Sequence, residues 1–209
     1  MRCGAPPTGP AFPFDLCPAC LLASALSAGD EPCPYQVLTP IGDGSKGVTY
    51  LAQALTGTRR LVALTLCHPR EDAERVLSRY ARWQPALARI RHPSAGTLLD
   101  AGLTAEGGLY VATAYVPGWP LTALASRALG MSDRLELAHQ MTEAVAAAHA
   151  EGIVHLKLGS SKVKISTANG PRAALLGFGA GLVVDGLEGP PDLDVLAVGR
   201  IIQELGIGG

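Results

Sequence analysis

The sequence lacks an excess of charge of either sign, because 17 lysines and arginines accompany 18 aspartates and glutamates. This balance provides no basic surface for a nucleic-acid backbone or for an anionic membrane. Long hydrophobic runs are also absent, and no apolar stretch approaches the ~20 residues that a membrane-spanning helix needs. We therefore expect a chain that binds neither nucleic acid nor membrane.

A disulfide framework is also missing from the sequence. The five cysteines are an odd number and gather toward the N-terminus, a usage that suits a reducing compartment. Residues 16–28 could be mistaken for the apolar region of a signal peptide, but they contain two cysteines and follow Asp15 and four prolines. These features predict a cytoplasmic location.

Composition divides the chain near residue 34. Residues 1–34 contain seven prolines separated by small residues, and proline removes backbone donors and resists both helices and strand ladders. We interpret this segment as an irregular tail or a very small module. The rest of the 209-residue chain is long enough to bury one sizeable core.

The region that follows the tail predicts five short strands and one helix. Apolar and β-branched residues punctuated by glycines indicate the strands. Pro85 should end or kink the helix, because proline cannot donate the backbone hydrogen bond of a helix interior. The predicted strands cover residues 35–40, 49–55, 60–66, 98–103 and 109–116, and the predicted helix covers residues 71–90.

The remainder of the chain has a mainly helical pattern. Apolar side chains at steps of three and four predict a helix over residues 132–150, with Ser132 as its N-cap. Two short strands are predicted at 163–166 and 173–176. A last helix over 194–205 is apolar on most sides, so we expect it to pack on a protein partner, a second copy or residues outside this chain. The residues expected at this contact include Val195, Ile201, Ile202 and Leu205.

A glycine-rich segment, Gly42-Asp43-Gly44-Ser45-Lys46-Gly47, has the G-x-G-x-x-G spacing of phosphate-binding loops. A dinucleotide-binding fold would need a helix directly after the glycines, whereas residues 49–55 continue as a predicted strand. A glycine-rich hairpin turn is the plain alternative. The motif alone does not decide between a phosphate loop and a simple turn.

Several motifs occur along the chain in the order that marks protein kinases. They are the glycine loop, Val62-Ala63-Leu64, Arg91-His92-Pro93, a long helix, Ile153-Val154-His155 and Gly177-Phe178-Gly179. From Tyr35 to about Leu205 the chain resembles bacterial serine/threonine protein kinases of the Hanks type, in a degenerate and C-terminally truncated form. The resemblance implies an α+β, two-lobe fold. Its N-lobe (35–116) would hold an antiparallel five-stranded sheet and one helix, and its incomplete C-lobe (117–209) would be mainly helical.

The resemblance also implies where the catalytic groups of a kinase would lie, and every one of these positions holds a different residue. For the phosphate lysine, its partner glutamate, the catalytic aspartate and the two metal ligands, the chain has Thr65, Trp83 (or its neighbour Gln84), Lys157, Lys162 and Gly177. Kinase catalysis depends on positioning and on electrostatic stabilisation by these groups. We therefore expect no phosphoryl transfer, no magnesium and a pseudokinase that acts as a protein-binding or regulatory module.

Two alternatives to a pseudokinase stay open. The position of Lys46 resembles the with-no-lysine kinases, whose phosphate lysine comes from the glycine loop, so an atypical ATP-binding serine/threonine kinase is one alternative. A decayed kinase gene fragment without stable function is the other. The segment between Gly177 and Asp194 is too short for the usual activation loop, so we expect activation by phosphorylation to be absent.

Nucleotide binding without turnover is a separate question. The resemblance places Thr49 and Ala63 above an adenine and Lys164 below it. Together with Lys157 and Lys162, Lys164 could attract phosphates without metal, but the cost of burying unpaired ammonium groups favours a solvated basic face. The residues of an ATP site would be Gly42, Gly44, Lys46, Gly47, Thr49, Ala63, Thr113, Tyr115 and Lys164.

Two further features follow from the resemblance. His155, Phe178 and Leu87 match residues that stack between the lobes of an assembled kinase, which implies that the apolar frame is kept. Cysteines in the tail resemble ligands of the small zinc ribbon that precedes some bacterial kinases, with an unstructured tail as the alternative. The possible zinc ligands are Cys3, Cys17, Cys20 and, as a substitute for a ligand that would precede Met1, Cys33.

Overall fold

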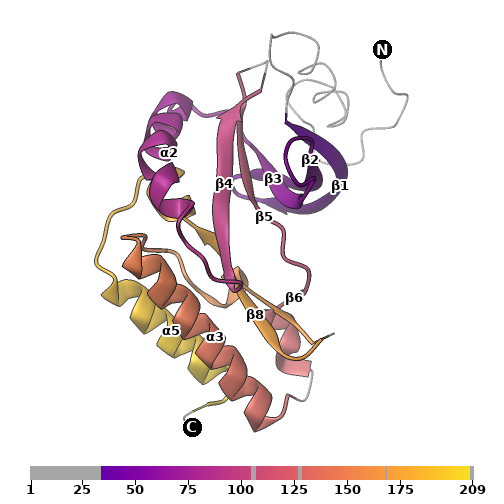
Figure 1. Ribbon diagram of the computed structural model, residues 1–209, viewed down its shortest axis with the longest axis vertical. Coiled ribbons are helices and arrows are strands. Elements are labelled where there is room, and N and C mark those ends of the chain that lie inside the picture. The colour runs from indigo at the N-terminus through magenta and orange to yellow at the C-terminus, as the bar shows by residue number, and fades with distance from the viewer. Residues whose placement is uncertain (1–33, 105–106, 127–128, 168, 208–209) are drawn as a thin grey trace. The chain divides into compact units, whose positions relative to one another are not determined.

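The structure is a computed structural model that describes residues 34–104, 107–126, 129–167 and 169–207 (Figure 1). The possible zinc ligands Cys3, Cys17, Cys20 and Cys33 lie outside these residues. The described chain forms two compact units. Unit 1 comprises the described parts of residues 1–73 and 101–112, and unit 2 comprises those of residues 74–100 and 113–209. The segment 74–100, which we expected in the N-lobe, is thus grouped with unit 2.

Unit 1 is built on strands. β1 (Tyr35–Gly44), β2 (Gly47–Ala54) and β3 (Leu61–Cys67) pair antiparallel in sequence order. β5 (Leu109–Ala114) and β4 (Ala95–Leu103) extend the strand order to β1-β2-β3-β5-β4, and both strands contain residues of each unit. Alternate residues of β2 and β3 are buried, as expected for strands with one face on a core. The five predicted strands of this region are confirmed.

The sheet of unit 2 follows the strand order β4-β8-β7-β6. β8 (Arg172–Phe178) pairs parallel with β4 and antiparallel with β7 (Val163–Ser166). β6 (Trp119–Pro120) pairs antiparallel with β7 at the edge of this sheet. The two short strands predicted around 163–166 and 173–176 are confirmed as β7 and β8, whereas the sequence did not indicate β6.

Helices make up the rest of unit 2. The longer ones are α2 (Ala73–Leu87), α3 (Met131–Ala150) and α5 (Asp192–Glu204), and a short α4 (Ala180–Val183) follows β8. Two 3₁₀ turns, η1 (Leu121–Ser126) and η2 (Ser160–Lys162), connect the other elements. α3 packs against β8 and α5 (Figure 1), and its buried side chains recur at the helical spacing predicted from sequence. Strands and helices together confirm the α+β class.

One local prediction about the helices needs correction. Ser132 is not the N-cap of α3, because the helix begins at Met131 and the extended Gly130 occupies the cap without a side-chain hydrogen bond. Pro85 lies inside α2, which ends at Leu87. A proline in the last turn of a helix removes only one backbone donor, so α2 continues past it before it stops.

The residues predicted to form a contact surface on α5 do not all lie on its exposed side. Ile201 and Leu205 are 1% and 6% exposed and belong to the core of unit 2, and Ile202 is half-buried. Val195 is 59% exposed, and Leu193 and Leu196 beside it are also exposed. A helix that packs on α3 must turn one side inward, so Ile201 and Leu205 are not available to a partner. None of the helices in the described ranges is long and apolar enough to cross a membrane.

Candidate functional site

The glycine loop is the tip of the β1–β2 hairpin in unit 1, where Gly44 pairs with Gly47 across Ser45 and Lys46. Gly47 has a φ of 143°, and a Cβ atom there would collide with the carbonyl oxygen of Leu66 on β3. The packing of β2 on β3 therefore requires this glycine. At Gly42 and Gly44 a Cβ atom would meet nothing within 4 Å, and neither residue has a positive φ. The described fold of unit 1 does not explain these two glycines.

Thr65, which the resemblance places at the position of the phosphate lysine, has its hydroxyl 2.9 Å from the hydroxyl of Thr49. The two residues are opposite one another on β3 and β2, and both are half-buried, as is Ala63 on the same face of β3. The structure thus brings together three of the predicted residues of unit 1. Lys46 is half-buried at the hairpin tip, where its carbonyl accepts the N–H of His68 at 2.9 Å.

The loop that follows α3 is organised around His155, which is 2% exposed. Its Nε2 atom lies 2.9 Å from the carbonyl oxygen of Leu176, and its ring meets the ring of Phe178 edge-on, with centroids 5.0 Å apart. A side chain at Gly179 would collide with Leu87, so Leu87 packs directly over the Gly177-Phe178-Gly179 turn. All three residues of the expected apolar frame therefore lie together inside unit 2.

Asp194 holds the same loop from the first turn of α5. This carboxylate is 1% exposed, accepts the backbone N–H groups of His155 at 2.7 Å and Leu156 at 2.9 Å, and lies 2.9 Å from Nε2 of His149. Leu156 has a φ of 65°, a left-handed conformation that is unusual for leucine. We infer that the fixed acceptor Asp194 holds the backbone in this shape. From sequence, Asp194 was predicted only to begin a helix. A carboxylate on an otherwise apolar helix is nevertheless a signal of a buried, hydrogen-bonded group.

Lys157 is the residue that the kinase resemblance places at the position of the catalytic aspartate. Its Nζ atom lies 3.2 Å from the carboxylate of Asp185, and the Lys157 side chain is 44% exposed. Its backbone N–H lies 3.3 Å from Nδ1 of His155. Asp185 comes just after α4 and was not singled out from sequence, because the pairing joins two loops that are distant along the chain. Lys157 therefore takes part in an ion pair between two loops.

Lys164 and Lys157 do not share a partner. The Nζ atom of Lys164 on β7 lies 3.3 Å from the carbonyl oxygen of Val116 and 5.6 Å from the ring centroid of Tyr115, in a cation–π contact. Lys162 is exposed at the end of η2. Thr113 is half-buried near the end of β5. Lys157 and Lys164 are thus engaged by different partners.

Trp83 makes a contact with a neighbouring arginine, and Gly177 has a left-handed backbone conformation. The half-buried Trp83 of α2 lies under the guanidinium of Arg82, 5.3 Å from the ring centroid, whereas Gln84 is exposed. Gly177 has a φ of 91°, which glycine adopts without a steric penalty and aspartate does not. A return of aspartate to this position would strain the backbone in the described conformation.

The segment after Gly179 forms the short helix α4. Arg79 of α2 caps this helix, since its Nε atom donates to the carbonyl oxygen of Val183 at 2.7 Å and a terminal nitrogen donates to that of Val184 at 3.4 Å. Leu182, Val183 and Val184 are buried. We infer that arginine donors and apolar packing together hold this segment in place.

Lys162 and Gly177, which the resemblance places at the two metal-binding positions of a kinase, do not fit magnesium. Magnesium takes oxygen ligands, whereas position 162 has an ammonium group and position 177 has no side chain. Within the described part of the chain, no three histidine, cysteine, aspartate or glutamate side chains gather closely enough to hold a metal ion.

Burial lowers the pKa of His155 below its ordinary value of 6.5. The hydrogen bond with Leu176 and the charge of Asp194 act in the opposite direction, and the charge of Lys162 adds to the lowering. The folded state therefore resists protonation of this ring, while the unfolded chain takes up the proton below about pH 6.5. The neutral His155 ring contributes its full stabilisation at pH values above its pKa in the unfolded chain. This stabilisation is lost as the pH falls from that pKa through the lower pKa of His155 in the folded state.

We predict that the free energy of unfolding falls on acidification from pH 8 to pH 5, with His155 contributing up to about 1.4 kcal/mol per pH unit. The His155→Gln variant lacks this titration and should show a flatter profile. Urea unfolding at a series of pH values measures the difference. His139→Gln is the matched control, because this histidine side chain is 63% exposed. Identical pH slopes for the wild type and His155→Gln would contradict the prediction.

Comparison with known proteins was made by sequence and by structure. No protein-family model matches the chain. The serine/threonine-protein kinase pkn3 of Myxococcus xanthus is 28% identical over 163 residues, which cover 76% of this chain and 30% of that protein. The probable serine/threonine-protein kinase PkwA of Thermomonospora curvata is 32% identical over 154 residues, which cover 73% of this chain and 20% of that protein. The chain thus spans less than a third of these curated relatives.

The solved structures that resemble this chain are kinase domains, as the names of the sequence relatives lead one to expect. The kinase domain of PknI from Mycobacterium tuberculosis matches with a TM-score of 0.64 and 23% sequence identity, and the match covers 85% of this chain and 76% of that domain. At this level of identity the likeness establishes the fold, and it confirms the fold predicted from the motif order.

Proposed function

Because the chain is a kinase-like protein of the bacterial Hanks type, we propose that it is a pseudokinase, which binds or regulates a protein and transfers no phosphate. The ion pair between Lys157 and Asp185 carries this proposal. A kinase needs a proton acceptor near the substrate hydroxyl, and an ammonium group cannot accept a proton. General-base catalysis is typically worth about 10²–10⁴-fold, so this replacement alone would cost most of the rate.

The other replacements act in the same direction. The hydroxyl of Thr65 is engaged by Thr49 and offers no positive charge to a phosphate. Positions 162 and 177 supply no oxygen ligand for a cation. The electrostatic stabilisation that makes the largest contribution to many transfer reactions is therefore missing. Such losses are not additive, but they leave no group in the expected position for base, lysine or metal chemistry.

We predict that the purified full chain transfers no γ-phosphate from ATP to itself or to a generic basic protein substrate, with either magnesium or manganese. Radiolabelled ATP measures the transfer, and an active bacterial kinase assayed in parallel shows that the conditions permit it. Incorporation that the Lys46→Ala variant abolishes, and that Arg172→Ala leaves unchanged, would overturn the proposal. Arg172 is a suitable control because it is exposed at the start of β8.

An atypical ATP-binding kinase is a second candidate, and the glycine loop favours it. Gly42 and Gly44 are not required by the described fold of unit 1, yet glycines at these positions would allow a phosphate to approach the backbone closely. A ligand that binds only the folded state raises the melting temperature. Melting curves with and without ATP, each with and without magnesium, separate the candidates, and a rise that Gly44→Ala removes would establish a nucleotide site.

The binding role requires a surface for a partner. Leu193, Val195 and Leu196 on the outer side of α5 are 48%, 59% and 60% exposed, and an apolar group of this kind is common at protein contacts. A partner protein or a second copy at this face belongs to the proposal. A cytoplasmic location also belongs to it, on the basis of the cysteine usage.

A further inference from the structure

Helix α2 and the turn after it carry an excess of positive charge that the balanced composition of the whole chain conceals. Residues 73–92 contain five arginines and one glutamate, whereas the rest of the chain has 12 basic and 17 acidic side chains. One of these arginines, Arg79, is half-buried and caps α4. Arg75, Arg82 and Arg89 are exposed and follow one another at steps of seven residues. We call these three residues the arginine row.

The arginine row follows one side of α2. Seven residues are close to two turns of an α-helix, so side chains at this spacing lie on the same side, about 10 Å apart. α2 ends at Leu87, but the N–H of Ala88 still donates to the carbonyl oxygen of Gln84 at 2.9 Å, which continues the helical path up to Arg89. All of these residues belong to unit 2. An elongated partner that lies along α2 therefore meets the whole row.

Arg89 shows which chemical group the row binds. Its Nε atom lies 2.5 Å from the carboxylate of Glu151, just past the end of α3. Arg75 and Arg82 take part in no ion pair with the described residues. The guanidinium of Arg82 lies over the ring of Trp83, 5.3 Å from its centroid. Such a contact uses the flat face of the guanidinium and leaves its N–H groups for an acceptor.

The charges of the row do not stabilise α2 itself. The helix dipole favours cations in the last turn and disfavours them in the first. Arg75 lies in the first turn beside Glu74, and the last turn contains no basic residue. Arg82 has no acidic residue three or four positions away on either side, where a carboxylate would stabilise the helix. Because these placements do not favour the folded helix, they indicate that the arginines act on a group outside the chain.

An acidic helix fits the row better than a nucleic acid does. Carboxylates seven positions apart on a helix have the same spacing of about 10 Å, and guanidinium groups bind carboxylates through paired N–H donors. Strong nucleic-acid binding rests on about 6–10 phosphate contacts, whereas the row has two arginines that are not already paired. The net negative charge of the rest of the chain opposes a long polyanion. A short partner avoids this repulsion, because charges beyond a Debye length of about 8–10 Å are screened.

We propose that the arginine row binds an acidic helix of a partner protein, whose carboxylates at seven-residue spacing pair with Arg75 and Arg82. The inference rests on the binding role proposed above and names a class of partner for it. The row is a different surface from the outer side of α5. Binding at the row requires no phosphate transfer, so a positive transfer assay would overturn the pseudokinase proposal without deciding the result of the peptide assay.

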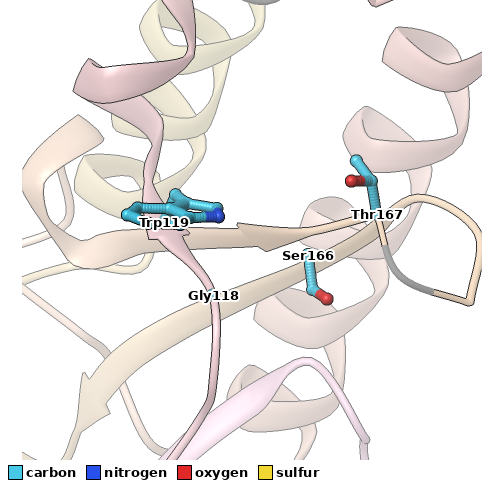
Figure 2. A pocket seen from close by; sticks show the side chains of 4 residues that line it. All are labelled: Gly118, Trp119, Ser166 and Thr167. Atoms are coloured by element: carbon cyan, nitrogen blue, oxygen red, sulfur yellow. The ribbon is translucent and has the colours of Figure 1, made fainter.

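Trp83 allows a direct test on the full chain, because it lies beside Arg82. The other tryptophan, Trp119, is at the hollow that Figure 2 shows, and the Trp119→Phe variant leaves Trp83 as the only tryptophan. The probe is an alanine-rich helical peptide with a glutamate at every seventh position. Titration with this peptide at low salt should change the Trp83 fluorescence in a saturable way. The change should disappear at about 1 M salt, where the Debye length is about 3 Å.

Substitution of the row should weaken the binding of the probe. Arg75→Gln and Arg82→Gln should each reduce the affinity by up to about fivefold, as expected for an exposed ion pair, and the double variant by about tenfold or more. Calorimetry measures these affinities, since a change at Arg82 alters the fluorescence of Trp83 directly. Arg200→Gln is the matched control, because Arg200 is exposed on α5, and it should bind the probe as the wild type does.

A second peptide tests the spacing. It has the same composition, with a glutamate at every fifth position, which places the carboxylates on different sides of the helix, and it should bind at least about threefold more weakly than the probe. Equal binding of the two peptides would contradict the proposal, as would an unchanged affinity in the double variant. Tighter binding of oligothymidylate than of the probe would assign the row to nucleic acid instead.

Discussion

Replacing Asp194 by alanine is expected to destabilise unit 2 by about 3–5 kcal/mol, the usual cost of removing one partner from a buried charged network. The carboxylate is 1% exposed and serves the N–H groups of His155 and Leu156 as well as the ring of His149. Without it, buried donors remain unsatisfied. For a chain of this size the melting temperature should fall by roughly 10 °C.

Differential scanning calorimetry measures the melting temperature, and Asp192→Ala is the matched control, because Asp192 is exposed in the same first turn of α5. Hydrogen exchange gives a second measurement, since the amides of His155 and Leu156 should lose protection in Asp194→Ala and not in Asp192→Ala. Equal melting temperatures for the two variants would refute the anchoring role. A cooperative transition of the wild type would count against a decayed gene fragment.

Replacing Gly47 by alanine is expected to cost about 2–4 kcal/mol, the sum of a strained backbone conformation and local overpacking. A methyl group at this position meets the carbonyl oxygen of Leu66, and the φ of 143° is one that alanine rarely adopts. Gly44→Ala in the same hairpin should be neutral or should stabilise the chain by up to about 1 kcal/mol, because it restricts the unfolded chain without a clash.

Urea unfolding followed by circular dichroism compares the two glycine variants under the same conditions. A large difference between Gly47→Ala and Gly44→Ala is the expected result. If both variants lost the same stability, the assignment of a structural role to Gly47 alone would be wrong. The comparison also shows whether Gly44→Ala is folded, which its use in the nucleotide-binding experiment requires.

The fold was largely predictable because its signals are local or ordered along the chain. Apolar and β-branched residues punctuated by glycines predicted the strands of unit 1, and the steps of three and four predicted α3. The cap of α3 was assigned to Ser132, since a serine side chain near a helix start usually accepts a backbone hydrogen bond, whereas the extended Gly130 takes this place. The short elements β6, η1, η2 and α4 carry too few residues to show any period.

The sequence predicted which residues lie at the candidate site, but not which partners their side chains contact. Position counting predicted that Lys157 and Thr65 are replacements, while their partners Asp185 and Thr49 became visible only in the structure. The expected partner surface on α5 changed for a similar reason. Apolar residues on all sides of a helix do not reveal which side faces inward, and packing against α3 buries Ile201 and Leu205.

The sequence by itself determined the kinase-like order of motifs and the glycine hairpin, and it predicted the replacement of each catalytic side chain, because these depend on residue type and spacing. Only the tertiary structure decided that Asp194 anchors the loop of His155, that Lys157 pairs with Asp185, and that Gly47 is required while Gly44 is not. Each of these outcomes depends on groups that are distant along the chain and meet only after folding, and residue spacing carries no information about such contacts.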